Sequence, residues 1–80
     1  MKKKGKERPM PEMHYVDSSN IEAMGYDPAT QEPHVRFLQS GETNVYYNVG
    51  EWVFDEMMQG DSKGTYLNTN IKGRYDYGKL

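Results

Sequence analysis

The stretch that decides the fold runs from residue 43 to residue 59 and reads TNVYYNVGEWVFDEMMQ. Residues 43–49 alternate with the period of a half-buried strand. The period then changes, because Val49, Trp52, Val53 and Met57 fall at helical spacing, which is typical of an amphipathic helix. The sequence therefore predicts a strand at 43–49 that leads directly into a short helix at about 50–59.

Signals at the helix ends indicate a second helix after the first. Asn48 followed by Glu51 fits a capping arrangement for the first helix, and Gly60 fits its end. A second helix is expected to begin at Asp61 or Ser62. Its expected buried positions are Tyr66, Leu67 and Ile71, and its expected end is Gly73.

Two more strands are predicted before this region, at about 21–26 and 34–38. Asp27 and Pro28 open a turn between them, since proline presets φ and the aspartate side chain can bond nearby backbone. Residues 39–42 make the next tight connection. Helices this short are not stable alone, so both must lie on the sheet. The expected fold is α+β, a three-stranded antiparallel meander followed by two short helices packed on one face.

Composition limits the class of protein. A chain of 80 residues allows one domain with a thin core. It has no cysteine, which excludes disulfides, thiolate chemistry and cysteine-based zinc sites and favours a reducing compartment. No apolar run is long enough to span a bilayer. We therefore expect a soluble, cytoplasmic protein without a membrane partner.

Charge is divided unevenly along the chain. Residues 1–13 hold five basic against two acidic side chains, whereas residues 14–80 hold five basic against ten acidic ones. We expect residues 1–13 to form a disordered basic tail and residues 14–80 to form the single domain. The basic residues of the tail, which could attract phosphates, are Lys2, Lys3, Lys4, Lys6 and Arg8.

The order of motifs resembles the KTSC domain, which is named for its occurrence at the C-terminus of some lysyl-tRNA synthetases and is also found as a small stand-alone protein. The resemblance covers about residues 15–77. It implies the fold expected above, and it carries no established activity; RNA binding is implied by the synthetase context alone. The motifs that carry it are Val16 to Ile21, Met24 to Asp27, Val45 to Val49, Asp61 to Asn68 and Ile71 to Tyr75.

Two groups of residues are candidate nucleic-acid contacts. Alternation places His34 and Arg36 on one face of their strand, and Tyr46, with Tyr26 as a further member, could join them on the face that the helices leave open. Tyrosine rings can stack on bases and arginine can hold phosphate, although cross-strand pairs of this kind also stabilise sheets without a ligand. The second group closes the chain and consists of Lys72, Arg74, Tyr75, Tyr77 and Lys79.

No catalytic or metal-binding set is recognisable. Ser18 and Ser19 lack a nucleophile-elbow pattern and fit turn hydrogen bonds, and the two histidines, His14 and His34, lack ligand spacing. We expect a non-enzymatic binding module with no cofactor that binds RNA weakly. The alternative is a protein-interaction or adaptor module that uses an acidic helix carrying Glu51, Asp55 and Glu56. The sequence leaves the partner and the oligomeric state open.

Overall fold

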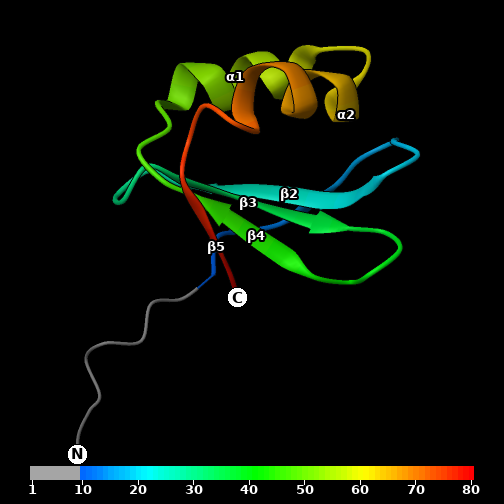
Figure 1. Cartoon of the computed structure of the whole chain (residues 1–80), viewed down its shortest axis with the longest axis horizontal. Helices are drawn as coiled ribbons and strands as arrows, with labels where there is room; N and C mark the ends of the chain where they lie inside the picture. The colour runs from blue at the N-terminus through cyan, green and yellow to red at the C-terminus, as the bar shows by residue number, and fades with distance from the viewer. Residues whose placement is uncertain (1–9) are drawn as a thin grey trace, which may run out of the picture.

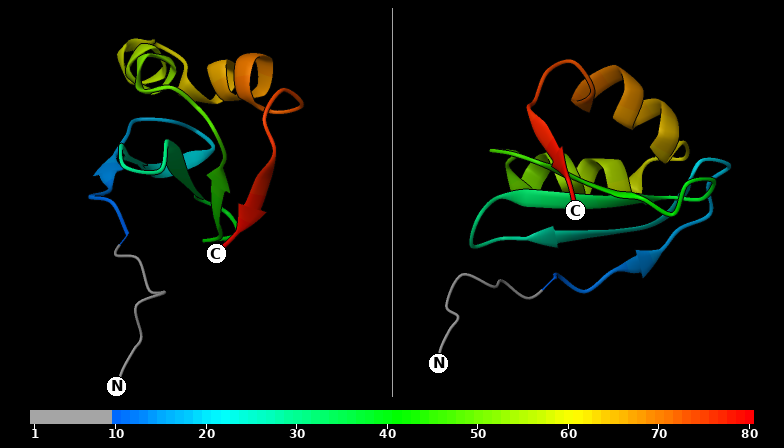
Figure 2. Two further views of the ribbon diagram at one scale, coloured as in Figure 1. Left: turned by 90° about the vertical axis from the view of Figure 1, so that its left-hand side faces the viewer. Right: turned by 60° about the horizontal axis from the view of Figure 1, so that its bottom comes forward.

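The computed structural model describes residues 10–80 and shows an α+β fold in two layers, a sheet and a helical layer. Five antiparallel strands lie in the order β1-β2-β3-β4-β5. Two helical segments lie between β4 and β5 in the chain, and Figures 1 and 2 show both of them above the same side of the sheet. In chain order the elements are β1 His14–Tyr15, β2 Ile21–Asp27, β3 Glu32–Phe37, β4 Thr43–Tyr46, α1 Glu51–Gln59, α2 Lys63–Tyr66, η1 Leu67–Ile71 and β5 Tyr77–Lys79.

The three predicted strands are present as β2, β3 and β4, but the sheet is larger than predicted. The expectation of three strands is wrong because β1 and β5 add one short strand at each edge. Strands of two and three residues are too short to show a period in the sequence. The strand expected at 43–49 also ends early, at Tyr46, and Asn48 adopts a positive φ of 59° before the first helix.

The core lies between the sheet and the helices. Met24, Val35 and Tyr46 from the sheet form one buried cluster with residues of α1 and η1. Helix α1 contributes Val53, Phe54 and Met57, and η1 contributes Leu67 and Ile71. Leu67 and Ile71 are buried as predicted, whereas Tyr66 is only partly buried.

The helix ends differ in part from the predicted caps. The residue before α1 is Gly50, and no side chain caps this helix, so the predicted pairing of Asn48 with Glu51 is wrong. The second helix does begin at a serine, since Ser62 Oγ accepts a hydrogen bond from the Thr65 backbone N–H at 3.4 Å. This helix continues into the π-helical turn η1, where the Lys72 N–H donates to the Leu67 carbonyl at 2.9 Å. Gly73 follows with a φ of 82°, which fits its predicted role as the stop.

Ile71→Ala is predicted to destabilise the domain strongly. Ile71 is 1 % exposed within the core, and truncation of a buried isoleucine typically costs about 2–5 kcal/mol. The midpoint of urea or thermal unfolding, followed by circular dichroism, measures the loss. Thr69→Ala is the matched control, because Thr69 is exposed on the same segment. Equal melting temperatures for the two variants would contradict the assigned packing of η1.

Candidate nucleic-acid interface

The structure does not bring the predicted open-face residues together. Tyr46 is 1 % exposed and belongs to the core between sheet and helices. His34 is paired with Val45, and Arg36 with Thr43, so both lie on the other face, because neighbouring residues of a strand point to opposite sides. The placement of Tyr46 beside His34 and Arg36 was therefore wrong. The period of β4 was correct, but with apolar side chains at both Val45 and Tyr46 it did not identify the face that the helices cover.

Neither Tyr46 nor Tyr26 lies on the face that carries His34 and Arg36. His34 is 6 % exposed, and its Nδ1 lies 3.1 Å from the Glu32 carbonyl oxygen. Arg36 Nε lies 3.4 Å from a carboxylate oxygen of Glu22. Tyr26, the further candidate, donates its hydroxyl hydrogen to the Val49 carbonyl at 2.6 Å and packs against the core.

Residues just before β1 lie against this same face. Gly25 is the cross-strand partner of His34, and a side-chain carbon at Gly25 would come within 2.5 Å of the Glu12 carbonyl oxygen and 2.9 Å of Met13 Sδ. Residues 10–13 of the expected tail thus belong to the described structure. The basic residues Lys2, Lys3, Lys4, Lys6 and Arg8 lie outside the described residues, and their assignment stays a prediction.

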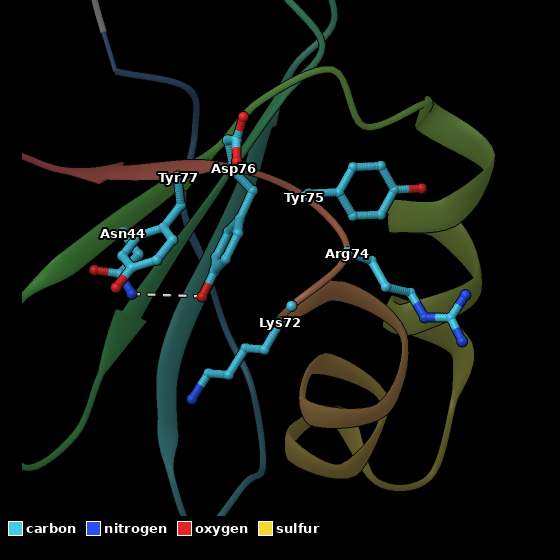
Figure 3. Close-up of a pocket in the computed structure, with 8 residues that line it drawn as sticks. Asn44, Lys72, Arg74, Tyr75, Asp76 and Tyr77 are labelled. Atoms are coloured by element: carbon cyan, nitrogen blue, oxygen red, sulfur yellow. Dashed lines mark hydrogen bonds between the residues drawn. The ribbon is translucent and has the colours of Figure 1, made fainter.

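A hollow at the edge of the fold gathers most of the second predicted group. It has a volume of about 680 Å³ and lies where the 72–77 segment passes from η1 to β5 beside β4. We call it the C-terminal pocket (Figure 3). Lys79 is not part of it and instead pairs with Glu42 at 3.3 Å. The pocket is lined by Asn44, Tyr46, Lys72, Gly73, Arg74, Tyr75, Asp76 and Tyr77.

Hydrogen bonds to one buried residue fix the start of the 72–77 segment. The Ile71 carbonyl accepts from the Arg74 N–H at 3.0 Å and from the Tyr75 N–H at 3.1 Å. At the far end of the segment, the Asp76 carbonyl accepts from the Tyr47 N–H at 2.9 Å, which attaches it to the end of β4. The pocket is thus formed by backbone that is bonded at both ends.

The neutral polar groups of the pocket come from β4 and β5. Asn44 Nδ2 donates to the Tyr46 hydroxyl oxygen at 3.4 Å, as drawn in Figure 3. Burial raises the pKa of Tyr46 above its usual value, and this effect exceeds the lowering by Asn44. The phenol therefore stays protonated at neutral pH and keeps a hydroxyl that can both donate and accept. The Tyr77 ring packs against Tyr46 with a centroid separation of 5.5 Å, yet Tyr77 is 54 % exposed.

Two cations line the pocket. Lys72 Nζ lies 5.4 Å from the centroid of the Phe37 ring, a cation–π arrangement. Figure 3 shows Lys72 extending on the side of the Asn44 to Tyr46 hydrogen bond and Arg74 extending from the other side of the segment. Within residues 10–80 neither side chain forms an ion pair. With Asp76 as the single acidic lining residue, the pocket is a positive region on an otherwise acidic domain.

A second hollow of about 400 Å³, which is more polar than the C-terminal pocket, lies beyond Lys72, and Lys72 lines both hollows. It is bounded by the loop before β2 and by α2, where a side-chain carbon at Gly64 would lie 3.5 Å from Asn20 Nδ2. Ser18 Oγ accepts from the backbone N–H groups of Asn20 and Ile21, each at 3.2 Å. The predicted turn role of Ser18 is thus confirmed.

Asn44 is the pocket residue that the sequence reasoning missed. Its signal was its position two residues before Tyr46 in the same strand, which places both side chains on one face. Within residues 10–80, no three histidine or acidic side chains are grouped so that they could hold a metal ion. The described helices also include none that is long and apolar enough to cross a membrane.

Residues 17–75 match the KTSC domain family, and the chain belongs to this family. A protein of Tsukamurella paurometabola is 44 % identical over 63 residues, which cover 79 % of this chain and 92 % of that protein. A lysine–tRNA ligase of a Nostoc species is 36 % identical over 64 residues, which cover 80 % of this chain but 11 % of the ligase. The crystal structure of a KTSC domain protein from Yersinia pestis superimposes with a TM-score of 0.83 at 31 % identity and covers 89 % of this chain and 99 % of its own.

Gly25→Ala is predicted to weaken the attachment of the segment before β1. The added methyl group cannot fit beside the Glu12 carbonyl oxygen, so the segment must shift away from β2. We expect a lower melting temperature and faster amide hydrogen exchange at residues 13–16. Gly60→Ala is the control, because its nearest contact would lie at 3.6 Å, an ordinary separation. Unchanged exchange in Gly25→Ala would show that residues 12 and 13 do not rest on this face.

Proposed function

We propose that this KTSC domain is a non-enzymatic module that binds single-stranded RNA through the C-terminal pocket. The observation that carries the proposal is the pocket itself, where an exposed Tyr77 ring and an amide–phenol pair lie on the same side of the 72–77 segment as Lys72, while Arg74 extends from its other side; neither cation has an ion-pair partner in residues 10–80. Its volume falls within the range of about 300–1,000 Å³ that is usual for small-ligand sites. A single nucleotide is a ligand of this size.

Each part of a nucleotide has a suitable partner in the pocket. The open side of the Tyr77 ring can stack on a base, and Asn44 with the Tyr46 hydroxyl can bond to the polar edge of that base. Lys72 and Arg74, on the two sides of the segment, can each contact a phosphate. Stacking and phosphate contacts tolerate any sequence, so we propose binding with little sequence preference.

The relatives support RNA as the class of ligand. By its name, the Nostoc relative acts on tRNA, and this chain resembles about a tenth of that enzyme. A short module that recurs within such an enzyme and in small proteins fits an RNA-binding accessory domain better than a catalytic one. We propose that it acts in the cytoplasm, because a chain without cysteine forms no disulfide and so needs no oxidising compartment.

The acidic balance of the domain sets the expected strength of binding. Residues 14–80 carry a net charge of −5, which repels a polyanion, whereas residues 1–13 carry +3. We propose that the binding is weak and depends on salt, and that Lys2, Lys3, Lys4, Lys6 and Arg8 add non-specific attraction. His34 and Arg36 take no part in the proposed pocket.

The double variant Lys72→Ala/Arg74→Ala is predicted to weaken RNA binding about tenfold at low salt, because it removes both phosphate partners. Fluorescence anisotropy of a labelled eight-nucleotide oligouridine measures the affinity over a range of salt concentrations. The magnitude of the slope of log affinity against log salt should decrease by about 1.4, because each of the two lost phosphate contacts contributes about 0.7.

The control for this experiment is a single Arg36→Ala substitution, which removes a cation from the other face of the sheet. Its affinity should stay within twofold of the parent at every salt concentration. All variants keep the same residues 1–13, so attraction by these residues is common to them. Equal weakening by the control and the double variant would mean that general charge, and not the pocket, determines binding.

Tyr77→Ala is predicted to weaken binding by about 1–3 kcal/mol if its ring stacks on a base. Tyr15→Ala is the matched control, because Tyr15 is also an exposed tyrosine of a short edge strand, at the opposite edge of the sheet. Thermal melts of both variants check that the sheet is intact. A parent-like affinity of a folded Tyr77→Ala variant would exclude the stacking role.

A further inference from the structure

The outer face of α1 carries a tryptophan in the middle of acidic side chains. Trp52, the second residue of α1, is 70 % exposed, whereas the other side of this helix packs into the core. Helical spacing places Asp55 and Glu56 three and four residues after Trp52, so they flank it on the same face. We call this surface the acidic tryptophan face; it consists of Glu51, Trp52, Asp55, Glu56 and Gln59, all of them exposed.

Within residues 10–80, no cation neutralises this charge. Glu51 and Asp55 are like charges at a spacing of four residues, which destabilises a helix slightly. Helix α1 contains no basic residue that could compensate. Among residues 10–80, none of the acidic side chains of α1 forms an ion pair. The negative field also reaches a neighbouring group, since burial first and then the charges of Glu51 and Asp55 raise the pKa of Tyr26.

The indole and one carboxylate of this face each contact another part of the fold. The Trp52 ring rests against the backbone at Gly50, where a side-chain carbon would come within 3.0 Å of Cδ1 and 3.1 Å of Nε1. A side chain at position 50 would require the ring to move slightly from this position. The Glu56 carboxylate accepts a hydrogen bond from the Tyr66 hydroxyl of α2.

We propose that the acidic tryptophan face binds a cationic, arginine-containing peptide segment of a partner protein. A guanidinium group can stack on the exposed indole while the surrounding carboxylates accept its hydrogen bonds. Tryptophan is also among the residues that most often anchor protein interfaces. The same charge repels nucleic acid, so this surface is distinct from the C-terminal pocket and shares no residue with it.

The protein supplies its own reporter for the test, because Trp52 is the single tryptophan of the chain. The full chain is titrated with an acetylated eight-residue peptide of alternating arginine and glycine, and tryptophan emission is recorded. We expect a saturable change in emission that is lost as salt is raised, because exposed charges are screened. A peptide of alternating glutamate and glycine and an eight-nucleotide oligouridine serve as negatively charged controls.

Two variants separate charge from stacking. Glu51→Gln/Asp55→Asn/Glu56→Gln should weaken arginine-peptide binding about tenfold, because the complementary charge is removed. Its control, Asp17→Asn/Glu42→Gln/Asp61→Asn, changes the net charge equally at acidic residues outside α1 and should bind within twofold of the parent. Trp52→Ala, measured with a labelled peptide by anisotropy, should lose about threefold or more in affinity.

Each alternative result overturns the proposal. The proposal is wrong if the arginine peptide gives no saturable change in emission, or if the two triple variants weaken peptide binding equally. It is also wrong if Trp52→Ala binds the peptide as tightly as the parent. A larger emission change with oligouridine than with the arginine peptide would assign the face to nucleic acid instead. Melting curves of every variant confirm that the substitutions at these exposed positions leave the domain folded.

Discussion

Burial of Ile71 against the sheet is the contact on which the C-terminal part of the structure depends. Its side chain anchors η1 in the core, while its carbonyl accepts the backbone hydrogen bonds that shape the 72–77 segment. That segment delivers β5 to the edge of β4 and brings Lys72, Arg74 and Tyr77 beside Asn44. The position of the candidate site therefore follows from apolar packing at one residue.

The sequence predicted the central elements because each carries a strong period or a turn signal. The alternation in 43–49 and the change to helical spacing at Val53 and Met57 were sufficient to place β4 and α1. The edge strands β1 and β5 were missed because a period cannot appear in two or three residues. The π-helical turn was also missed, since the four-residue spacing of Leu67 and Ile71 is equally that of an α-helix.

The candidate site was predictable only in part. The cluster of Lys72, Arg74, Tyr75 and Tyr77 stands together in the sequence, and one segment is enough to hold it together in space. To predict the open-face group, one must know which side of β4 the helices cover. Because Val45 and Tyr46 are both apolar, the sequence does not show which side that is. Tyr46 belongs to the core cluster between the sheet and the helices, and its hydroxyl accepts the hydrogen bond of Asn44 in the pocket.

The most direct test of the account is to record amide and side-chain ¹⁵N–¹H NMR spectra of the full chain while an eight-nucleotide oligouridine is added. The account predicts that the largest shifts occur at residues 72–77 and at the Asn44 side-chain amide, with little change at residues of α1 such as Asp55. Largest shifts at His34 and Arg36, or no shifts within residues 10–80 at low salt, would contradict it.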